Sequence, residues 1–264
     1  MILSELEAVI ASKAESGSLP QLISDTLSLH SHITPLDTSA TRHKMYLLED
    51  MGVQYIVRTE PELDSLPGVE PDRERRILDA INAFDWSPNV LINEPQQGLL
   101  IMQHAGHCTD ILNASQKALI VRAVVEMQGV TDVPSMDYLH LFNHYRHALT
   151  DQGHQQLIDE TEHLLMSLPI LPSVLVHHDL HPGNICWQNG APTIIDWEYA
   201  GLGNAWLDFA VLTRDLGFTD QELVQFPLLQ GVETGELAHW VAESIQVIEQ
   251  LETLWLHYKT QFSG

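Results

Sequence analysis

The stretch HHDLHPGN at residues 177–184 decides the fold that we expect for this chain. It places a His, an Asp and an Asn at the spacing H-x-D-x-x-x-x-N, and the run IIDWE follows at 194–198. Three short β-like runs, VLVH, NICWQ and TIID, surround these two segments, although the rest of this part of the chain has helical periodicity. A polar loop between short strands is a typical place for catalytic groups.

These residue types suit phosphoryl transfer from ATP. Asp179 can accept or orient the proton of a hydroxyl group, so we expect it to be catalytic. Asn184 lies on the same loop and Asp196 ends the next apolar run, so both can supply oxygen ligands to the Mg²⁺ that bridges the ATP phosphates. The spacing therefore predicts a kinase that uses ATP and Mg²⁺.

A zinc site is the competing interpretation of the same stretch. His177, His178 and His181 surround Asp179, and three further histidines share one face of an expected helix: His140, His144 and His147. Imidazoles do bind zinc, but no Glu follows His140, so the pattern is not that of a zinc protease helix. The second set is also consistent with an amphipathic helix that half-buries its imidazoles.

The chain divides into two expected lobes and an α+β fold. In residues 1–103 we expect a helix at 3–15, a hairpin of 45–50 with 53–58, a helix at 72–84, and a hairpin of 90–94 with 99–103. Residues 104–264 are mostly helical, at about 110–130, 136–150, 153–168, 205–216 and 233–262. The first lobe is expected to bind nucleotide, and the second to carry the catalytic loop and the acceptor.

A kinase needs further groups for ATP. Arg58 ends a strand and Glu74 lies on the following helix, so we expect Arg58 to contact phosphate and Glu74 to position it. Backbone groups of Gln103, His104 and Ala105 are candidates for binding adenine. The loop before the second strand, TPLDTSATRHKMY at 34–46, contains no glycine. Its Ser39 and Thr41 are the candidates for holding phosphate there.

The net charge of the chain limits the kinds of molecule that it is expected to bind. The chain has 264 residues, 12 Lys and Arg against 36 Asp and Glu, and a net charge of −24. Residues 1–103 hold 16 acids and 7 bases, and residues 104–264 hold 20 acids and 5 bases. A chain this acidic is a poor candidate for binding nucleic acid or an anionic membrane, and it suits a cationic substrate or simple solubility.

Other compositional features predict a cytoplasmic protein. The two cysteines do not form a disulfide framework or a zinc motif. The first residues contain acids and no long apolar run, so we expect no secretory signal and no membrane span. No obligate protein partner is indicated.

The motifs resemble the aminoglycoside phosphotransferase and choline kinase superfamily. VHHDLHPGNICW is similar to its catalytic loop and IIDWEYAGLGNAWLDFA to its metal-binding segment. The match is strong over 174–212 and weaker over 45–106, and the glycine-free loop departs from the family pattern. The resemblance implies a protein-kinase-like bilobal fold, with Asp196 as metal ligand, Asp208 as a structural residue and His177 as a support of the loop.

The segment IDWEYAG at 195–201 is similar to the corresponding segment of bacterial thiamine and choline kinases. The resemblance implies thiamine as first acceptor, then choline or ethanolamine, then an aminoglycoside. Aromatic faces and carboxylates bind such cations, so the candidates are Glu198, Trp197, Tyr199 and Trp255, with Trp240 and Tyr258 as further aromatic candidates. For the three aromatics of the last expected helix, Trp240, Trp255 and Tyr258, a core position is the favoured alternative. A non-catalytic, pseudokinase-like binding protein remains the alternative of another class.

Overall fold

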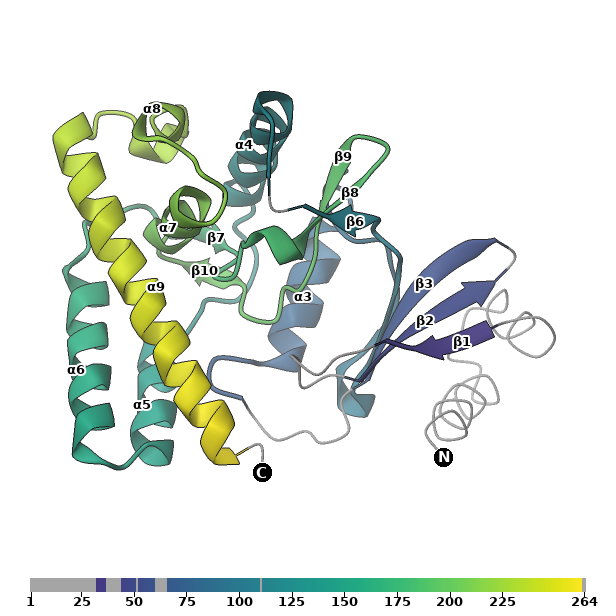
Figure 1. The fold of residues 1–264 in the computed structure, drawn as a ribbon, viewed down its shortest axis with the longest axis horizontal. Helices are drawn as coiled ribbons and strands as arrows, with labels where there is room; N and C mark the ends of the chain where they lie inside the picture. The colour runs from purple at the N-terminus through teal and green to yellow at the C-terminus, as the bar shows by residue number, and fades with distance from the viewer. Residues whose placement is uncertain (1–31, 37–43, 51, 60–65, 110, 263–264) are drawn as a thin grey trace. The chain divides into compact units, whose positions relative to one another are not determined.

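A computed structural model describes residues 32–36, 44–50, 52–59, 66–109 and 111–262 (Figure 1). The helix expected at 3–15 and the candidate phosphate contacts Ser39 and Thr41 lie outside the described residues. Two compact units make up the chain, one from 1–64 with 88–104 and the other from 65–87 with 105–264. The first unit thus lacks residues 65–87 and includes residue 104, and the expected division into lobes after residue 103 stays a prediction.

The first unit is built on an antiparallel five-stranded sheet with the order β1-β2-β3-β5-β4. Its strands are β1 (His32–Pro35), β2 (Lys44–Asp50), β3 (Val53–Thr59), β4 (Val90–Glu94) and β5 (Leu99–Gln103). Both expected hairpins are present, β2 with β3 and β4 with β5. The second turn is a short 3₁₀ helix, η1 (Pro95–Gln97), closed by Gly98 at a φ of +54°.

One face of this sheet carries the core of the first unit. Side chains alternate between the two faces of a strand, so residues two apart share a face. The buried cluster follows that rule along β2 and β5, and consists of Tyr46, Leu48, Val57, Ile92, Leu99 and Ile101. Val57 and Ile101 are fully buried and face each other across the β3–β5 pair.

The second unit is mostly helical and contains two small groups of strands. Its helices are α3 (Pro71–Ile81), α4 (Ala114–Gln128), α5 (Tyr138–Ala148), α6 (Gln152–Ser167), α7 (Trp206–Arg214), α8 (Asp220–Leu223) and α9 (Thr234–Phe262). Its strands are β6 (His107–Cys108), β7 (Val174–Val176), β8 (Ile185–Gln188), β9 (Ala191–Ile194) and β10 (Gly201–Gly203). Strands β6, β8 and β9 form one sheet, and β7 pairs with β10.

Helix α9 is the long support of this unit. It lies against α5, α6 and α7 (Figure 1). Its buried residues recur at helical spacing, as expected of a helix with one apolar face: Leu237, Val241, Ser244, Val247, Ile248 and Leu254.

The α+β class predicted from periodicity is confirmed. Helix α3 buries Ile77, Leu78 and Ile81 as expected, and the helices of the second half all begin within a few residues of the predicted positions. Strands β6 and β10 and helix α8 were not expected, because each is too short to leave a periodic pattern. Within the described residues, no helix is both long and apolar enough to cross a membrane.

Ile101→Ala tests the core of the first unit. Ile101 is 0% exposed, so the truncation leaves a cavity and should lower the free energy of unfolding by about 2–5 kcal/mol. Val53→Ala on β3, where Val53 is 37% exposed, is the control and should cost well under half as much. Urea unfolding measures both, and hydrogen exchange should place the loss in the strands of the sheet. Equal effects of the two variants would contradict this core.

Candidate active site

The predicted catalytic loop follows strand β7 and leads into β8. Strand β7 pairs antiparallel with β10, and Val176, the last residue of β7, is opposite Gly201. A short 3₁₀ helix, η2 (Pro182–Asn184), ends the loop. The loop therefore leaves one strand pair and enters the other sheet of the same unit, so both of its ends are anchored.

The carboxylate of Asp208 holds the start of the loop. Asp208 lies on α7 and is 1% exposed. Its Oδ2 accepts the backbone N–H of His177 and its Oδ1 accepts that of His178, both at 2.9 Å. The side chain thus satisfies two buried amides that leave the β7 strand, which is a supporting position.

His177 is a buried, neutral side chain. Its Nε2 lies 3.0 Å from the carbonyl oxygen of Ile195, so Nε2 carries the proton and donates it. Its ring meets that of Trp197 edge-on at 4.6 Å. Burial lowers the pKa of His177 to about 4. Its contacts join the catalytic loop to the segment around Asp196, and none of these contacts involves Asp179.

His178 has a left-handed backbone, with a φ of +65°. Its Nε2 lies 2.7 Å from the hydroxyl of Tyr138, which also accepts the N–H of Asn204 at 2.9 Å. Gly203 packs against this pair, because a Cβ there would lie 2.5 Å from the Tyr138 hydroxyl and 2.9 Å from His178 Nε2. A non-glycine residue with positive φ in such a loop is a strained conformation that the surroundings impose.

Asn184 and Asp179 are brought together as the spacing predicted. The Nδ2 of Asn184 donates to both the backbone oxygen of Asp179, at 2.9 Å, and its Oδ2, at 3.0 Å. Both donors of the Asn184 amide therefore face Asp179. Its Oδ1 points the other way and is the oxygen that could reach a metal ion.

Carboxylates gather around Asp179. Burial, and then the charges of Asp196 and Glu198, raise the pKa of Asp179 to about 8, with Glu252 of α9 adding a smaller effect and the Asn184 hydrogen bond opposing the rise. Like charges held this close disfavour one another, so the site favours a positive charge among them. The burial of Asp179 is partial, because 41% of its side chain is exposed, so a reactant can reach the carboxylate.

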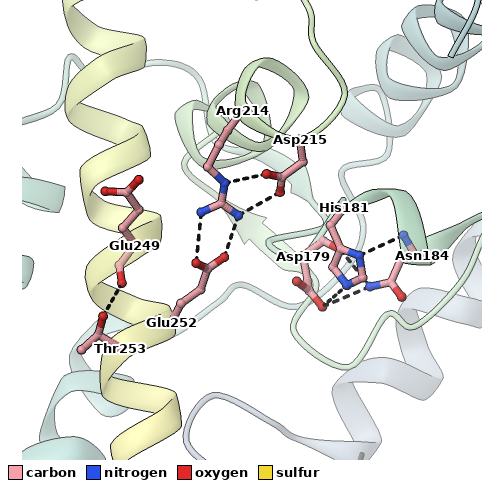
Figure 2. A network of polar contacts seen from close by, with 9 residues as sticks. Asp179, His181, Asn184, Arg214, Asp215, Glu249, Glu252 and Thr253 are labelled. Atoms are coloured by element: carbon pink, nitrogen blue, oxygen red, sulfur yellow. Dashed lines mark hydrogen bonds and ion pairs between the residues drawn. The ribbon is translucent and has the colours of Figure 1, made fainter. Parts of the chain in front are cut away.

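Figure 2 shows the ionic groups beside the loop. Arg214 binds Asp215 through Nε at 2.7 Å and Glu252 through Nη2 at 2.6 Å, so it connects the end of α7 to α9. On the loop, His181 Nδ1 accepts the N–H of Gly183, and its Nε2 lies 3.6 Å from Asp179 Oδ2. Burial lowers the pKa of His181. The charges of Asp215 and Glu252 oppose this effect, and the charge of Arg214 adds to it.

Asp196 follows strand β9 and has a φ of +64°. This conformation turns the chain sharply between Ile195, which binds His177, and Trp197. Among the described residues no three His, Cys, Asp or Glu side chains are grouped around one metal position. One carboxylate and one amide oxygen nevertheless fit Mg²⁺, which usually keeps several waters and takes few protein ligands.

The candidate acceptor residues have different surroundings. Trp197 is 0% exposed, stacks on Trp86 at 5.8 Å and donates to the Ile194 oxygen. Its expected contact with substrate is therefore replaced by a core position. Glu198 is 9% exposed, and its backbone oxygen accepts from Arg73 at 3.3 Å.

Tyr199 and Trp255 are half-buried and meet each other. Trp255 of α9 donates its indole N–H to the Tyr199 hydroxyl at 3.1 Å, and the Lys259 ammonium lies 4.8 Å over the Trp255 ring. Trp240 and Tyr258 are half-buried too. Tyr258 lies against His144 and Tyr145, so it contributes to helix packing.

The residues that we expect to bind ATP belong to both units. Arg58 is buried on β3 of the first unit, and Glu74 is buried on α3 of the second. Their pairing stays a prediction. The N–H of Gln103 donates to Asn89 and that of His104 to Gln54, both at 2.9 Å. These two amides are thus used within the first unit, and the role of Gln103, His104 and Ala105 toward adenine also stays a prediction.

The histidines expected as zinc ligands have other contacts. His177 and His178 are used in the loop, as described above. His144 lies against Tyr258, and His147 Nδ1 is 2.6 Å from the Asn143 oxygen. In the part of the chain that the structure describes, these side chains do not converge on one metal position.

Comparison with known proteins shows a sequence match that includes the catalytic loop, and a structural match to proteins of the same fold. Residues 124–243 match the model of the phosphotransferase enzyme family. The expected resemblance to the aminoglycoside phosphotransferase and choline kinase superfamily is confirmed over this segment, which includes the catalytic loop, Asp196 and Asp208. No curated protein sequence matches the chain.

Solved structures extend the similarity to nearly the whole chain. A choline kinase from Streptococcus pneumoniae is 18% identical with a TM-score of 0.69, and the alignment covers 97% of this chain and 91% of that one. A choline/ethanolamine kinase family protein from Mesorhizobium loti is 17% identical with a TM-score of 0.70, covering 98% and 87%. A spectinomycin phosphotransferase is 14% identical with a TM-score of 0.59, covering 92% and 87%. The kinase-like fold expected from the loop is therefore confirmed.

Sequence reasoning missed several residues that support the site. Tyr138 of α5 binds His178 of the loop, and Arg73 of α3 donates to the backbone oxygen of Glu198. Arg214 of α7 binds Glu252 of α9, and the charges of both act on His181 of the loop. Of the residues around the site, only Gly201 and Gly203 could have been recognised from the local sequence. Two glycines separated by a single residue in a strand indicate that other atoms approach the backbone closely. A Cβ at Gly201 would lie 2.7 Å from the Met136 nitrogen.

Gly203→Ala tests the packing under the loop. The added methyl group meets the Tyr138 hydroxyl and His178, so we expect a loss of about 1–3 kcal/mol in stability. Tyr138→Phe in the same chain removes the hydroxyl and should recover part of the loss that Gly203→Ala causes in the native background. Gly235→Ala, where a Cβ would have no neighbour within 4 Å, is the control. Additive effects of the Gly203 and Tyr138 changes would contradict the packing.

His177→Gln tests whether that imidazole is buried and neutral. The native pKa of about 4 lies below the ordinary value of 6.5. Below pH 6.5 the unfolded chain therefore takes up a proton that the folded chain does not, and wild type loses stability as pH falls. The stability difference between wild type and variant should shrink by about 1.4 kcal/mol from pH 7.5 to 5.5. Urea unfolding measures it.

His239→Gln, at an exposed histidine of α9, is the control for losing an imidazole from the unfolded chain. Parallel stability curves for wild type and His177→Gln across this range would show that His177 titrates normally in the folded protein.

Proposed function

We propose that this protein is an ATP-dependent phosphotransferase that phosphorylates a hydroxyl group of a small cationic alcohol. The observation that carries the proposal is the double hydrogen bond from Asn184 to Asp179, beside Asp196 and Glu198, within the segment that matches the phosphotransferase family model. This arrangement brings a proton acceptor and two oxygen ligands of the expected types into one loop and the segment after it.

Asp179 is the group that takes or orients the hydroxyl proton of the acceptor. Its burial and the charges of Asp196 and Glu198 raise its pKa above the ordinary value, so it takes up a proton more readily than a free carboxylate does. Asn184 restricts the rotation of this carboxylate, because its amide binds both the Asp179 side chain and its backbone. His177 and Asp208 keep the loop in place and are positioning residues.

Asn184 and Asp196 are the residues that would hold Mg²⁺ with ATP. The ion, when bound, neutralises charge on the phosphates during transfer. The carboxylates around Asp179 give it a favourable environment. Arg58 and Glu74 belong to the same proposal as the phosphate contact and its partner.

Two observations support a cationic acceptor. Asp179 is close enough to Asp196, Glu198 and Glu252 for their charges to raise its pKa, so a cation near it is favoured. The Lys259 ammonium lies 4.8 Å over the Trp255 ring, a cation–π contact of the kind by which a cationic acceptor would bind an aromatic side chain. Thiamine is the first acceptor to test, on the wording IDWEYAG. Choline and ethanolamine follow, and several proteins of similar fold are kinases of those alcohols.

A screen for ADP release tests this function with purified protein, ATP and MgCl₂. Thiamine, choline, ethanolamine, an aminoglycoside and a neutral alcohol of similar size are compared. We expect turnover with one cationic alcohol and a much higher KM for the neutral one, since charge contributes to binding. Binding of ATP without turnover on any of them would instead favour the non-catalytic, pseudokinase-like alternative.

Asp179→Asn tests the proton acceptor. The amide keeps the shape but cannot accept a proton, so kcat should fall by about 10²–10⁴-fold while ATP binding changes little. Glu160→Gln, at an exposed carboxylate of α6, is the control for charge and should retain wild-type kcat. Near-normal turnover of Asp179→Asn would remove Asp179 from the catalytic role.

A further inference from the structure

Two cysteines lie side by side at the edge of the small sheet of the second unit. Cys108 on β6 is the direct partner of Cys186 on β8 in the antiparallel register. Their Sγ atoms are 2.8 Å apart, and no disulfide joins them. Cys108 is exposed and Cys186 is buried. The residues are 78 positions apart in sequence, so nothing local in the chain indicates that they meet.

The backbone around the pair allows a disulfide. Directly opposite residues of an antiparallel pair have Cα atoms about 4.5–5.5 Å apart, within the range of about 4.4–6.8 Å found across disulfides. The sulfur atoms need to approach by only about 0.7 Å to reach the S–S bond length of about 2.05 Å. Gly106 keeps the strands close, since a Cβ there would lie 2.2 Å from the Trp187 oxygen.

We propose that Cys108 and Cys186 are a redox modification site, at which a low-molecular-weight disulfide such as oxidised glutathione converts the two thiols into an intramolecular disulfide. The thiolate of Cys108 attacks one sulfur of the reagent, forms a mixed disulfide and releases one glutathione thiolate. The thiolate of Cys186 then attacks the Cys108 sulfur and releases the second. The protein loses two protons and two electrons, and the reagent is reduced to two thiols.

Burial assigns the two sulfurs to different steps. Exposed Cys108 is the one that a dissolved disulfide can reach. Cys186 is buried and its Sγ lies 2.8 Å from that of Cys108, so it is placed to attack the Cys108 sulfur from within the protein. Cys108 is thus the attacking cysteine and Cys186 the resolving one.

The pair is connected to the catalytic loop. The Sγ of Cys108 donates to the backbone oxygen of Gly183 at 3.1 Å. Gly183 directly precedes Asn184, and Cys186 follows it by two residues. Oxidation removes the S–H donor from the Gly183 oxygen and ties β8 covalently to β6. The redox state of the pair therefore acts on the backbone that positions Asn184.

The test uses the full chain, incubated with oxidised glutathione and then with dithiothreitol. Mass spectrometry should show the loss of two hydrogens without added glutathione, a cross-linked peptide containing Cys108 and Cys186, and full reversal by dithiothreitol. Cys186→Ala should stop at the mixed disulfide on Cys108. Cys108→Ser, which changes an exposed position, should keep the fold and take up no glutathione under the same conditions.

Three results would overturn the proposal in wild type: both thiols remaining free, a stable glutathione adduct on Cys108, or a disulfide between two chains. Hydrogen exchange tests the connection to the loop without any assay of activity. Backbone amides of residues 180–188 should exchange about tenfold more slowly in the oxidised protein, because the cross-link suppresses local opening. Unchanged exchange with a proven disulfide would overturn that connection, and it would leave the phosphotransferase proposal unaffected.

Discussion

The carboxylate of Asp208 is the interaction on which the candidate site depends. Two successive amides, of His177 and His178, donate to its two oxygens at 2.9 Å in the interior. Successive N–H groups converge on one anion when the backbone changes hand between residues, and His178 does so with its φ of +65°. The strain at His178, the inward turn of His177 and the outward presentation of Asp179 are consequences of one buried hydrogen-bonding requirement.

The charges at the site are arranged in two groups. The charges of Asp196 and Glu198 raise the pKa of Asp179, and the Nε2 of His181 lies 3.6 Å from the Oδ2 of Asp179. Arg214 instead binds Asp215 and Glu252, on the side of the loop where His181 lies. The like charges around Asp179 suit a cation brought by the reactants, whereas the ion pairs of Arg214 with Asp215 and Glu252 join the end of α7 to α9.

Local patterns in the sequence predicted the two hairpins of the first unit, the long helices and the catalytic loop, since each has a periodicity or a spacing of its own. They did not predict the partners that reach the loop from elsewhere. Tyr138 begins a helix 40 residues before His178. Arg73 is buried, but nothing in the sequence distinguishes it from the exposed Arg75 and Arg76 on the same helix. Trp197 was expected at the acceptor because it follows Asp196, but tertiary packing places it between His177 and Trp86. Such choices depend on contacts between distant segments, which no local pattern records.

The stack of Trp86 on Trp197, with Phe84 on the outer side at 4.9 Å, has an optical consequence. Two indoles with centroids 5.8 Å apart and planes inclined by 30° couple their electronic transitions, and this gives a paired positive and negative band in circular dichroism. Trp197 also touches His177, at the root of the catalytic loop. The protein thus carries a built-in chromophore whose signal reports whether the segment after Asp196 is seated against the rest of its unit.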